Sequence, residues 1–148
     1  MGISFGINCR ECDYAKNLKL GIGMAYSPSN LVDFSSEFGM LRYLIRSKNT
    51  LQYVKMLITE KGGRIPYTYE HSIYHCPRCS EFYERFFYHI DYEGGTYEPK
   101  YQCSKCKAVL EKITGSDNDE NIDLSKYPCP KCGKYSLSED YSSVIMWD

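Results

Sequence analysis

The sequence predicts a small α+β fold in which two units of antiparallel strands carry one helical insertion. Three observations lead to this prediction. All eight cysteines belong to four Cys-x-x-Cys pairs, and the segments around these pairs alternate apolar and polar residues, as strands do. Residues 35–61 instead place apolar residues at helical spacing. With 148 residues and 15 tyrosines, the chain makes a modest core that needs further stabilisation.

In the first half of the chain, we expect strands over residues 2–8 and 18–26, where the apolar positions alternate. Two short helices should follow within residues 35–61. Asn49 is a suitable N-cap for the second of them, because Gln52 follows three residues later as a capping-box partner. The pair Gly62-Gly63 should end this helix.

The second half of the chain is expected to be mostly β. Strands are expected over residues 65–75, 81–93, 96–102 and 108–114, because these runs are rich in aromatic and β-branched residues. The pair Gly94-Gly95 separates two of them and indicates a tight hairpin. Residues 115–121 are polar and acidic, which is typical of a loop.

The cysteine pairs are the clearest functional signal, and we call each pair with its turn a knuckle. Two thiolates separated by two residues bind one ion, and two knuckles complete the tetrahedral four-cysteine shell that Zn²⁺ prefers. We therefore expect two structural Zn²⁺ ions, with iron as the alternative metal. No catalytic motif and no organic cofactor site is evident, so we expect a protein that is not an enzyme. The expected ligands are Cys9, Cys12, Cys76, Cys79, Cys103, Cys106, Cys129 and Cys132.

The spacing of the last three knuckles resembles that of the zinc-ribbon superfamily, in which two knuckles lie at one end of a β-hairpin. Cys129-Pro-Lys-Cys-Gly133 also resembles the second knuckle of rubredoxin-like sites, and Cys12-Asp-Tyr14 resembles the end of the first. The chain looks similar to small uncharacterised bacterial zinc-ribbon proteins with several Cys-x-x-Cys motifs. This resemblance covers about the C-terminal half of the chain and implies a fold and a metal, without implying an activity.

Two pairings of the knuckles fit the spacing. Sequential pairing makes residues 1–102, with the insert 35–61, a first unit and residues 103–148 a second ribbon. Nested pairing joins the second knuckle to the third through the Gly94-Gly95 hairpin, joins the first to the fourth, and gives one compact domain. We favour sequential pairing, because it follows the rubredoxin-like order of the knuckles.

A candidate interaction surface lies on the aromatic run that follows the second knuckle. If residues 82–90 form one strand, Tyr83, Arg85, Phe87 and His89 share a face. An aromatic and basic face of this kind anchors a partner protein or stacks on single-stranded bases. The alternative is that both faces of the strand are covered by the rest of the chain.

The charge distribution bears on the partner. The formal net charge is -1, and residues 75–148 carry nine basic against thirteen acidic side chains, which does not favour a nucleic-acid surface. We expect another protein as the partner, in a binding or adaptor role. The alternative is a transcription-related regulator that binds single-stranded nucleic acid, using lysines of the third and fourth knuckles. No signal peptide or membrane span is evident, so we expect a cytoplasmic protein.

Overall fold

The computed structural model describes residues 2–33, 35, 37–114 and 122–147. The α+β class is confirmed, with mostly antiparallel strands. The chain forms two compact units, and each combines segments that are distant in sequence. Unit 1 contains residues 1–21, 71–85 and 100–147, and unit 2 contains residues 22–70 and 86–99. The polar loop expected at 115–121 lies outside the described residues.

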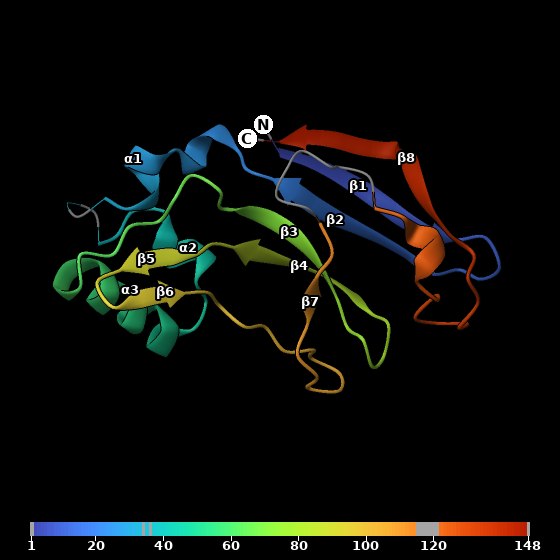
Figure 1. The fold of residues 1–148 in the computed structure, drawn as a ribbon. Coiled ribbons are helices and arrows are strands. Elements are labelled where there is room, and N and C mark those ends of the chain that lie inside the picture. The colour runs from blue at the N-terminus through green and yellow to red at the C-terminus, as the bar shows by residue number, and fades with distance from the viewer. Residues whose placement is uncertain (1, 34, 36, 115–121, 148) are drawn as a thin grey trace. The chain divides into compact units, whose positions relative to one another are not determined.

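The main element of unit 1 is a sheet with the strand order β4-β3-β2-β1-β8, in which β7 also pairs with β3 (Figure 1). Its strands are β1 (Gly2–Cys9), β2 (Ala15–Gly21), β3 (Glu70–His75), β4 (Phe82–Phe87), β7 (Glu111–Lys112) and β8 (Leu137–Trp147). The 3-10 turn η3 (Leu124–Lys126) precedes the fourth knuckle.

Strand β1 is central to unit 1, because β2 pairs with one of its edges and β8 with the other. Both pairings are antiparallel. Cys9 lies opposite Leu137 in β8, and the N–H of Arg10 donates to the carbonyl of Ser136 over 3.0 Å. The β1–β8 register shifts between Ser4 and Gly6, as at a β-bulge. This pairing brings the start of the first knuckle to the end of the fourth.

Unit 1 buries its apolar side chains in two clusters. The first gathers Ile7, Leu18 and Phe82 together with two cysteines of the first and fourth knuckles. The second gathers Tyr74 and Leu110 together with cysteines of the second and third knuckles. Each group of cysteines is therefore enclosed by its own part of the core.

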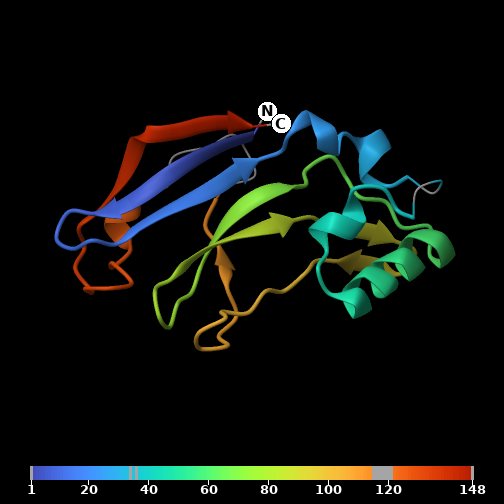
Figure 2. The same ribbon diagram turned by 180° about the vertical axis from the view of Figure 1, so that it is seen from behind.

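Unit 2 contains the helices and a two-stranded hairpin, and α3 lies beside the hairpin (Figure 2). Its elements are the 3-10 turn η1 (Met24–Tyr26), α1 (Pro28–Leu31), α2 (Leu41–Leu44), α3 (Lys48–Glu60), β5 (Ile90–Tyr92) and β6 (Gly95–Tyr97). The two helices expected within residues 35–61 correspond to α2 and α3.

The N-cap of α3 differs from the sequence prediction. Ser47 caps the helix, and its hydroxyl accepts a hydrogen bond from the N–H of Thr50 over 3.3 Å. Asn49 lies inside the first turn instead. Both residue types are good N-caps, and the helix begins one residue before Asn49, so the upstream serine takes the capping position.

The expected strand over residues 81–93 is two separate strands, because β4 ends at Phe87 and β5 begins at Ile90. The hairpin at Gly94-Gly95 is confirmed. Its register places Tyr92 opposite Gly95, and Gly94 has a φ of +109°, a conformation that favours glycine. The hairpin therefore joins β5 to β6 and does not include β4.

The core of unit 2 forms around one face of α3. Val54 and Leu57 are buried there and belong to the same cluster as Tyr69 and Tyr88. Gly63 lets the chain turn back past this helix, because a Cβ at this position would lie 2.8 Å from the carbonyl oxygen of Leu57. The apolar spacing seen in the sequence is thus the buried face of the helix.

Replacement of Leu57 by Ala should therefore destabilise the protein by about 2–5 kcal/mol, because the side chain is only 2% exposed and its loss leaves a cavity. Gln52→Ala, at an exposed position of the same helix, should change the free energy of unfolding by less than about 0.5 kcal/mol. Urea unfolding of the metal-loaded protein measures both. Equal losses for the two variants would contradict this packing.

Candidate metal centres

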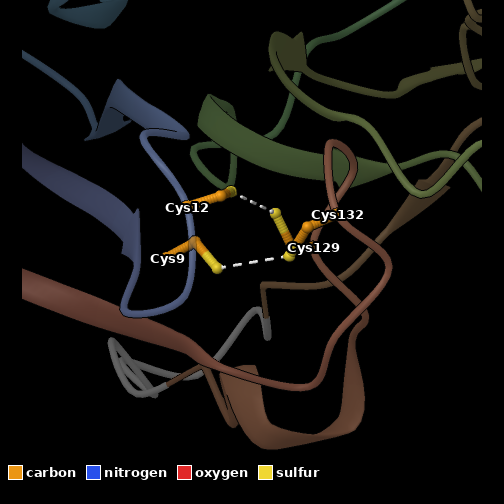
Figure 3. Close-up of side chains that lie close together, drawn as sticks. All are labelled: Cys9, Cys12, Cys129 and Cys132. Carbon is orange, nitrogen blue, oxygen red and sulfur yellow. Dashed lines mark hydrogen bonds between the residues drawn. The ribbon is translucent and has the colours of Figure 1, made fainter.

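The structure groups the eight cysteines into two quartets. Cys9 and Cys12 meet Cys129 and Cys132 (Figure 3), and within each quartet the sulfurs lie within 4.8 Å of one another. The other quartet contains Cys76, Cys79, Cys103 and Cys106. Among the described residues, these are the groups of metal-ligating side chains close enough to share an ion. Both quartets lie in unit 1.

The sulfur spacings fit tetrahedral metal coordination. The Zn–S distance of about 2.3 Å requires sulfurs about 3.8 Å apart at the corners of a tetrahedron. The Cys9–Cys132 and Cys12–Cys129 sulfur pairs are 3.7 and 3.6 Å apart. In the other quartet, the Cys76–Cys106 and Cys79–Cys103 sulfur pairs are both 3.4 Å apart. A small outward relaxation of the second quartet would give the same tetrahedron.

The pairing of the knuckles is nested, so our preference for sequential pairing was wrong. Sequential pairing relied on the order of knuckle types along the chain. The decisive contact is instead the β1–β8 ladder, which brings the first and fourth knuckles together across 117 to 123 residues of sequence. The two inner knuckles then pair with each other. The division at residue 102 followed from sequential pairing, whereas both quartets belong to unit 1.

Each of the four knuckles contains the same type of backbone hydrogen bond. In each, the N–H of the first cysteine donates to the carbonyl five residues later, over 2.8–3.0 Å. In the last three knuckles, the N–H of the residue four positions after the first cysteine also donates a hydrogen bond to the carbonyl of that cysteine. That residue is Ser80, Lys107 or Gly133, and each has a positive φ. Asp13, at the same position of the first knuckle, is not among the described residues with positive φ, so this knuckle has a different turn.

Backbone N–H groups within the knuckles point at the sulfurs. The N–H of Glu11 lies 3.4 Å from Cys9 Sγ, and the N–H of Lys131 lies 3.4 Å from Cys129 Sγ. Burial raises the pKa of Cys9, but hydrogen bonds, including the one from the Glu11 N–H, outweigh burial and lower this pKa to about 7. Because the thiolate is the form that binds a metal, the turn of the first knuckle prepares Cys9 for a cation.

Tyr83 supports the inner quartet. Its side chain is only 8% exposed, and its hydroxyl lies 3.2 Å from Cys103 Sγ and 3.0 Å from Ser104 Oγ. Burial raises the pKa of Cys103, but hydrogen bonds from Tyr83 and from two backbone N–H groups outweigh burial and lower this pKa to about 5. Tyr83 thus belongs to the buried core that surrounds the inner quartet.

Glu81 connects the two quartets and was not identified from the sequence. Its carboxylate is buried and accepts hydrogen bonds from the Tyr14 hydroxyl and the Lys105 ammonium group, each over 2.7 Å. Tyr14 follows the first knuckle, and Lys105 lies within the third. Burial opposes ionisation of Glu81, but these hydrogen bonds and the charge of Lys16 lower its pKa to about 2.

A positional signal for Glu81 was nevertheless present. Glu81 and Tyr14 each follow their knuckle by two residues, at the position whose carbonyl accepts the hydrogen bond from the first cysteine. Equivalent positions in two knuckles therefore face each other through their side chains. Because the order of the strands in the sheet cannot be predicted from the sequence, nothing connects these two positions until the structure is known.

Ion pairs join the knuckles of the outer quartet. Lys131 pairs with Asp13, and Lys134 pairs with Glu11 over 3.4 Å, so both pairs connect the fourth knuckle to the first. Four thiolates around a divalent cation leave a net negative charge, which these lysines help to balance. Exposed pairs of this kind contribute at most about 1 kcal/mol each.

The remaining residues of the candidate interaction surface lie in both units. Arg85, in unit 1, is half-buried and its guanidinium lies 4.8 Å from the centre of the Tyr83 ring. Phe87 and His89, in unit 2, are half-buried, and their ring centres are 6.4 Å apart. None of the three histidines belongs to a cysteine quartet. His75, next to the inner quartet, is buried against Phe82.

Comparisons with protein families, with curated proteins and with solved structures find no match to this chain. The support for the resemblance to zinc ribbons comes instead from the geometry of the two cysteine quartets. Among the residues that the structure describes, no helix is long and apolar enough to cross a membrane.

Nested pairing makes a sharp prediction for double variants. Cys9→Ser with Cys129→Ser damages only the outer quartet, so this variant should retain about one metal ion per chain. Cys9→Ser with Cys76→Ser damages both quartets and should retain none after dialysis against a weak chelator. Elemental analysis and cobalt absorption spectra distinguish these outcomes. The reverse result would restore sequential pairing.

Replacement of Glu81 by Gln should destabilise the metal-loaded protein by about 2 kcal/mol, because a buried carboxylate that accepts several hydrogen bonds is lost. Glu111→Gln, at an exposed position of unit 1, is the matched control and should change the stability by less than about 0.5 kcal/mol. Denaturant unfolding measures both effects. A control as unstable as the Glu81 variant would show that the effect is not specific to the buried position.

Proposed function

We propose that this chain is a two-zinc, non-enzymatic module that binds another protein. The observation that carries the proposal is the closure of both quartets, because four sulfurs from two knuckles surround each metal position. A four-cysteine shell leaves no coordination position for a substrate or a water molecule. Metals held in this way stabilise a fold instead of catalysing a reaction.

Zinc is the proposed metal, with iron as the alternative. Both accept a tetrahedral all-sulfur shell, so the sulfur spacings fit either metal. Zinc is favoured because a structural ion needs no electron-transfer partner, and the sequence carries no flavin or haem motif. Since eight reduced thiols are required, we place the protein in a reducing compartment such as the cytoplasm.

A protein partner is favoured over nucleic acid by the distribution of charge. The nucleic-acid alternative uses Lys105, Lys107, Lys131 and Lys134 as phosphate contacts. Three of these lysines already pair with carboxylates in the structure, namely Lys105, Lys131 and Lys134. Binding of phosphate would have to break these pairs. The aromatic and basic residues Arg85, Phe87 and His89 remain the candidate contacts for a protein.

The proposal is tested by affinity capture of the zinc-loaded chain followed by cross-linking and mass spectrometry. We expect a defined protein partner that resists nuclease treatment and is lost when a chelator removes the metal. A control with Glu98→Gln, an exposed position in unit 2, should retain the partner. Turnover of a substrate by the zinc-loaded chain would contradict the non-enzymatic role, and loss of that turnover in a zinc-ligand variant that still folds would contradict a purely structural role of the metal.

Single-stranded nucleic acid should bind weakly or not at all, because three of the four candidate lysines are paired. Fluorescence anisotropy with labelled single-stranded DNA and RNA, from low to physiological salt, measures this directly. Tight binding that weakens steeply as salt increases would favour the nucleic-acid alternative. In that case, Lys107→Gln should weaken the binding more than Gln102→Ala, a change at a nearby exposed position.

A further inference from the structure

Unit 2 contains an apolar pocket that is separate from the metal centres in sequence and in chemistry. Its volume is about 440 Å³, within the range of about 300–1,000 Å³ that is typical of binding sites. The apolar side chains that line it include Leu31, Val32, Ile58, Ile65 and Tyr69. They come from α1, from the last turns of α3 and from the segment after α3.

The pocket is built on firm local structure. Leu31 is 1% exposed and Tyr69 is 3% exposed, so both belong to the core. The hydroxyl of Tyr69 is occupied by a hydrogen bond to the carbonyl of Tyr26, which leaves the aromatic ring to line the pocket. Gly62, with a φ of +64°, turns the chain out of α3 and into the pocket wall.

The residues that line this apolar pocket include one cationic side chain. Arg64 lines it, and its backbone is fixed by two hydrogen bonds with Asp91, of 2.8 and 2.9 Å. The side chain of Arg64 is exposed, and no carboxylate of the described residues forms an ion pair with it. The residues that line the pocket include no acidic side chain. An occupant with an apolar part beside a negative charge would complement both features.

The surroundings favour a peptide as this occupant. Tyr67 is 69% exposed, and its ring contacts that of Tyr69, with ring centres 5.6 Å apart. Tyr and Arg are among the side chains enriched at the centres of protein interfaces.

We propose that this pocket receives an apolar side chain of a partner protein, and that Arg64 pairs with an Asp or Glu next to that side chain in the partner. This inference rests on the proposed protein-binding function and identifies where and by what chemistry the partner docks. It assigns the docking site to pocket residues of unit 2 that come from α1, from the end of α3 and from the segment after α3.

The test uses the full zinc-loaded chain and three short peptides with blocked ends. These are Glu-Leu-Leu-Glu, Lys-Leu-Leu-Lys and Glu-Ala-Ala-Glu. Methyl NMR spectra should show saturable shifts at Leu31, Ile58 and Ile65 with the acidic leucine peptide. The lysine peptide should bind about tenfold more weakly, because it brings like charge to Arg64. The alanine peptide should cause no saturable shift, since it lacks the apolar side chains.

Arg64→Gln should weaken binding of the acidic leucine peptide about fivefold to tenfold through loss of the charged pair. Arg46→Gln, which changes an exposed arginine of the same unit outside the pocket, should leave binding unchanged. Unchanged thermal unfolding of both variants confirms that the fold is intact. Equal affinity for the acidic and basic peptides, or an unaffected Arg64 variant, overturns the proposal.

Two further outcomes separate this inference from the proposed function. If a captured protein partner binds the Arg64→Gln variant as well as it binds the wild-type chain, the pocket assignment fails while the proposed binding function stands. If decanoate shifts the pocket methyl groups at lower concentration than the acidic peptide, the site takes a small amphiphile, and the peptide proposal is overturned.

Discussion

The meeting of the first and fourth knuckles is the contact on which unit 1 depends. It joins β1 to β8 and places four sulfurs at tetrahedral spacing. A structural zinc contributes about 10–16 kcal/mol in small zinc domains, which is as large as the net stability of about 5–15 kcal/mol of a typical domain. A metal ion bound by this quartet would therefore stabilise the pairing of β1 with β8.

The two metal centres are coupled through a buried charge. Glu81 accepts hydrogen bonds from a residue beside the outer quartet and from a lysine within the inner one. A disturbance at either centre moves a partner of this carboxylate, and an uncompensated buried carboxylate is costly. Glu81 thus links the surroundings of the two quartets.

The sequence was sufficient where the chemistry is local. Cys-x-x-Cys spacing identified the cysteines that form the two quartets, and the Gly94-Gly95 pair located a hairpin, because a knuckle and a turn each depend on a few neighbouring residues. The pairing of the knuckles could not be predicted from the sequence, since no pattern in the residues of β1 or β8 indicates that these two strands pair. The alternation through residues 82–90 was also misleading, because the break between β4 and β5 leaves no mark in the pattern. Tyr83 accordingly looked like a surface residue, although its hydroxyl lies against Cys103.

Nested pairing also imposes an order in time. The inner quartet joins sulfurs 24 to 30 residues apart, while the outer one joins sulfurs 117 to 123 residues apart. Closing the longer loop costs about 1.4 kcal/mol more in chain entropy, and closing the inner loop first reduces this cost. During synthesis at about 5–20 residues per second, Cys9 and Cys12 wait roughly 6–24 seconds for the fourth knuckle. Throughout that interval they are open thiols on a growing chain, so the first knuckle is the part most exposed to oxidation or to capture of the wrong metal.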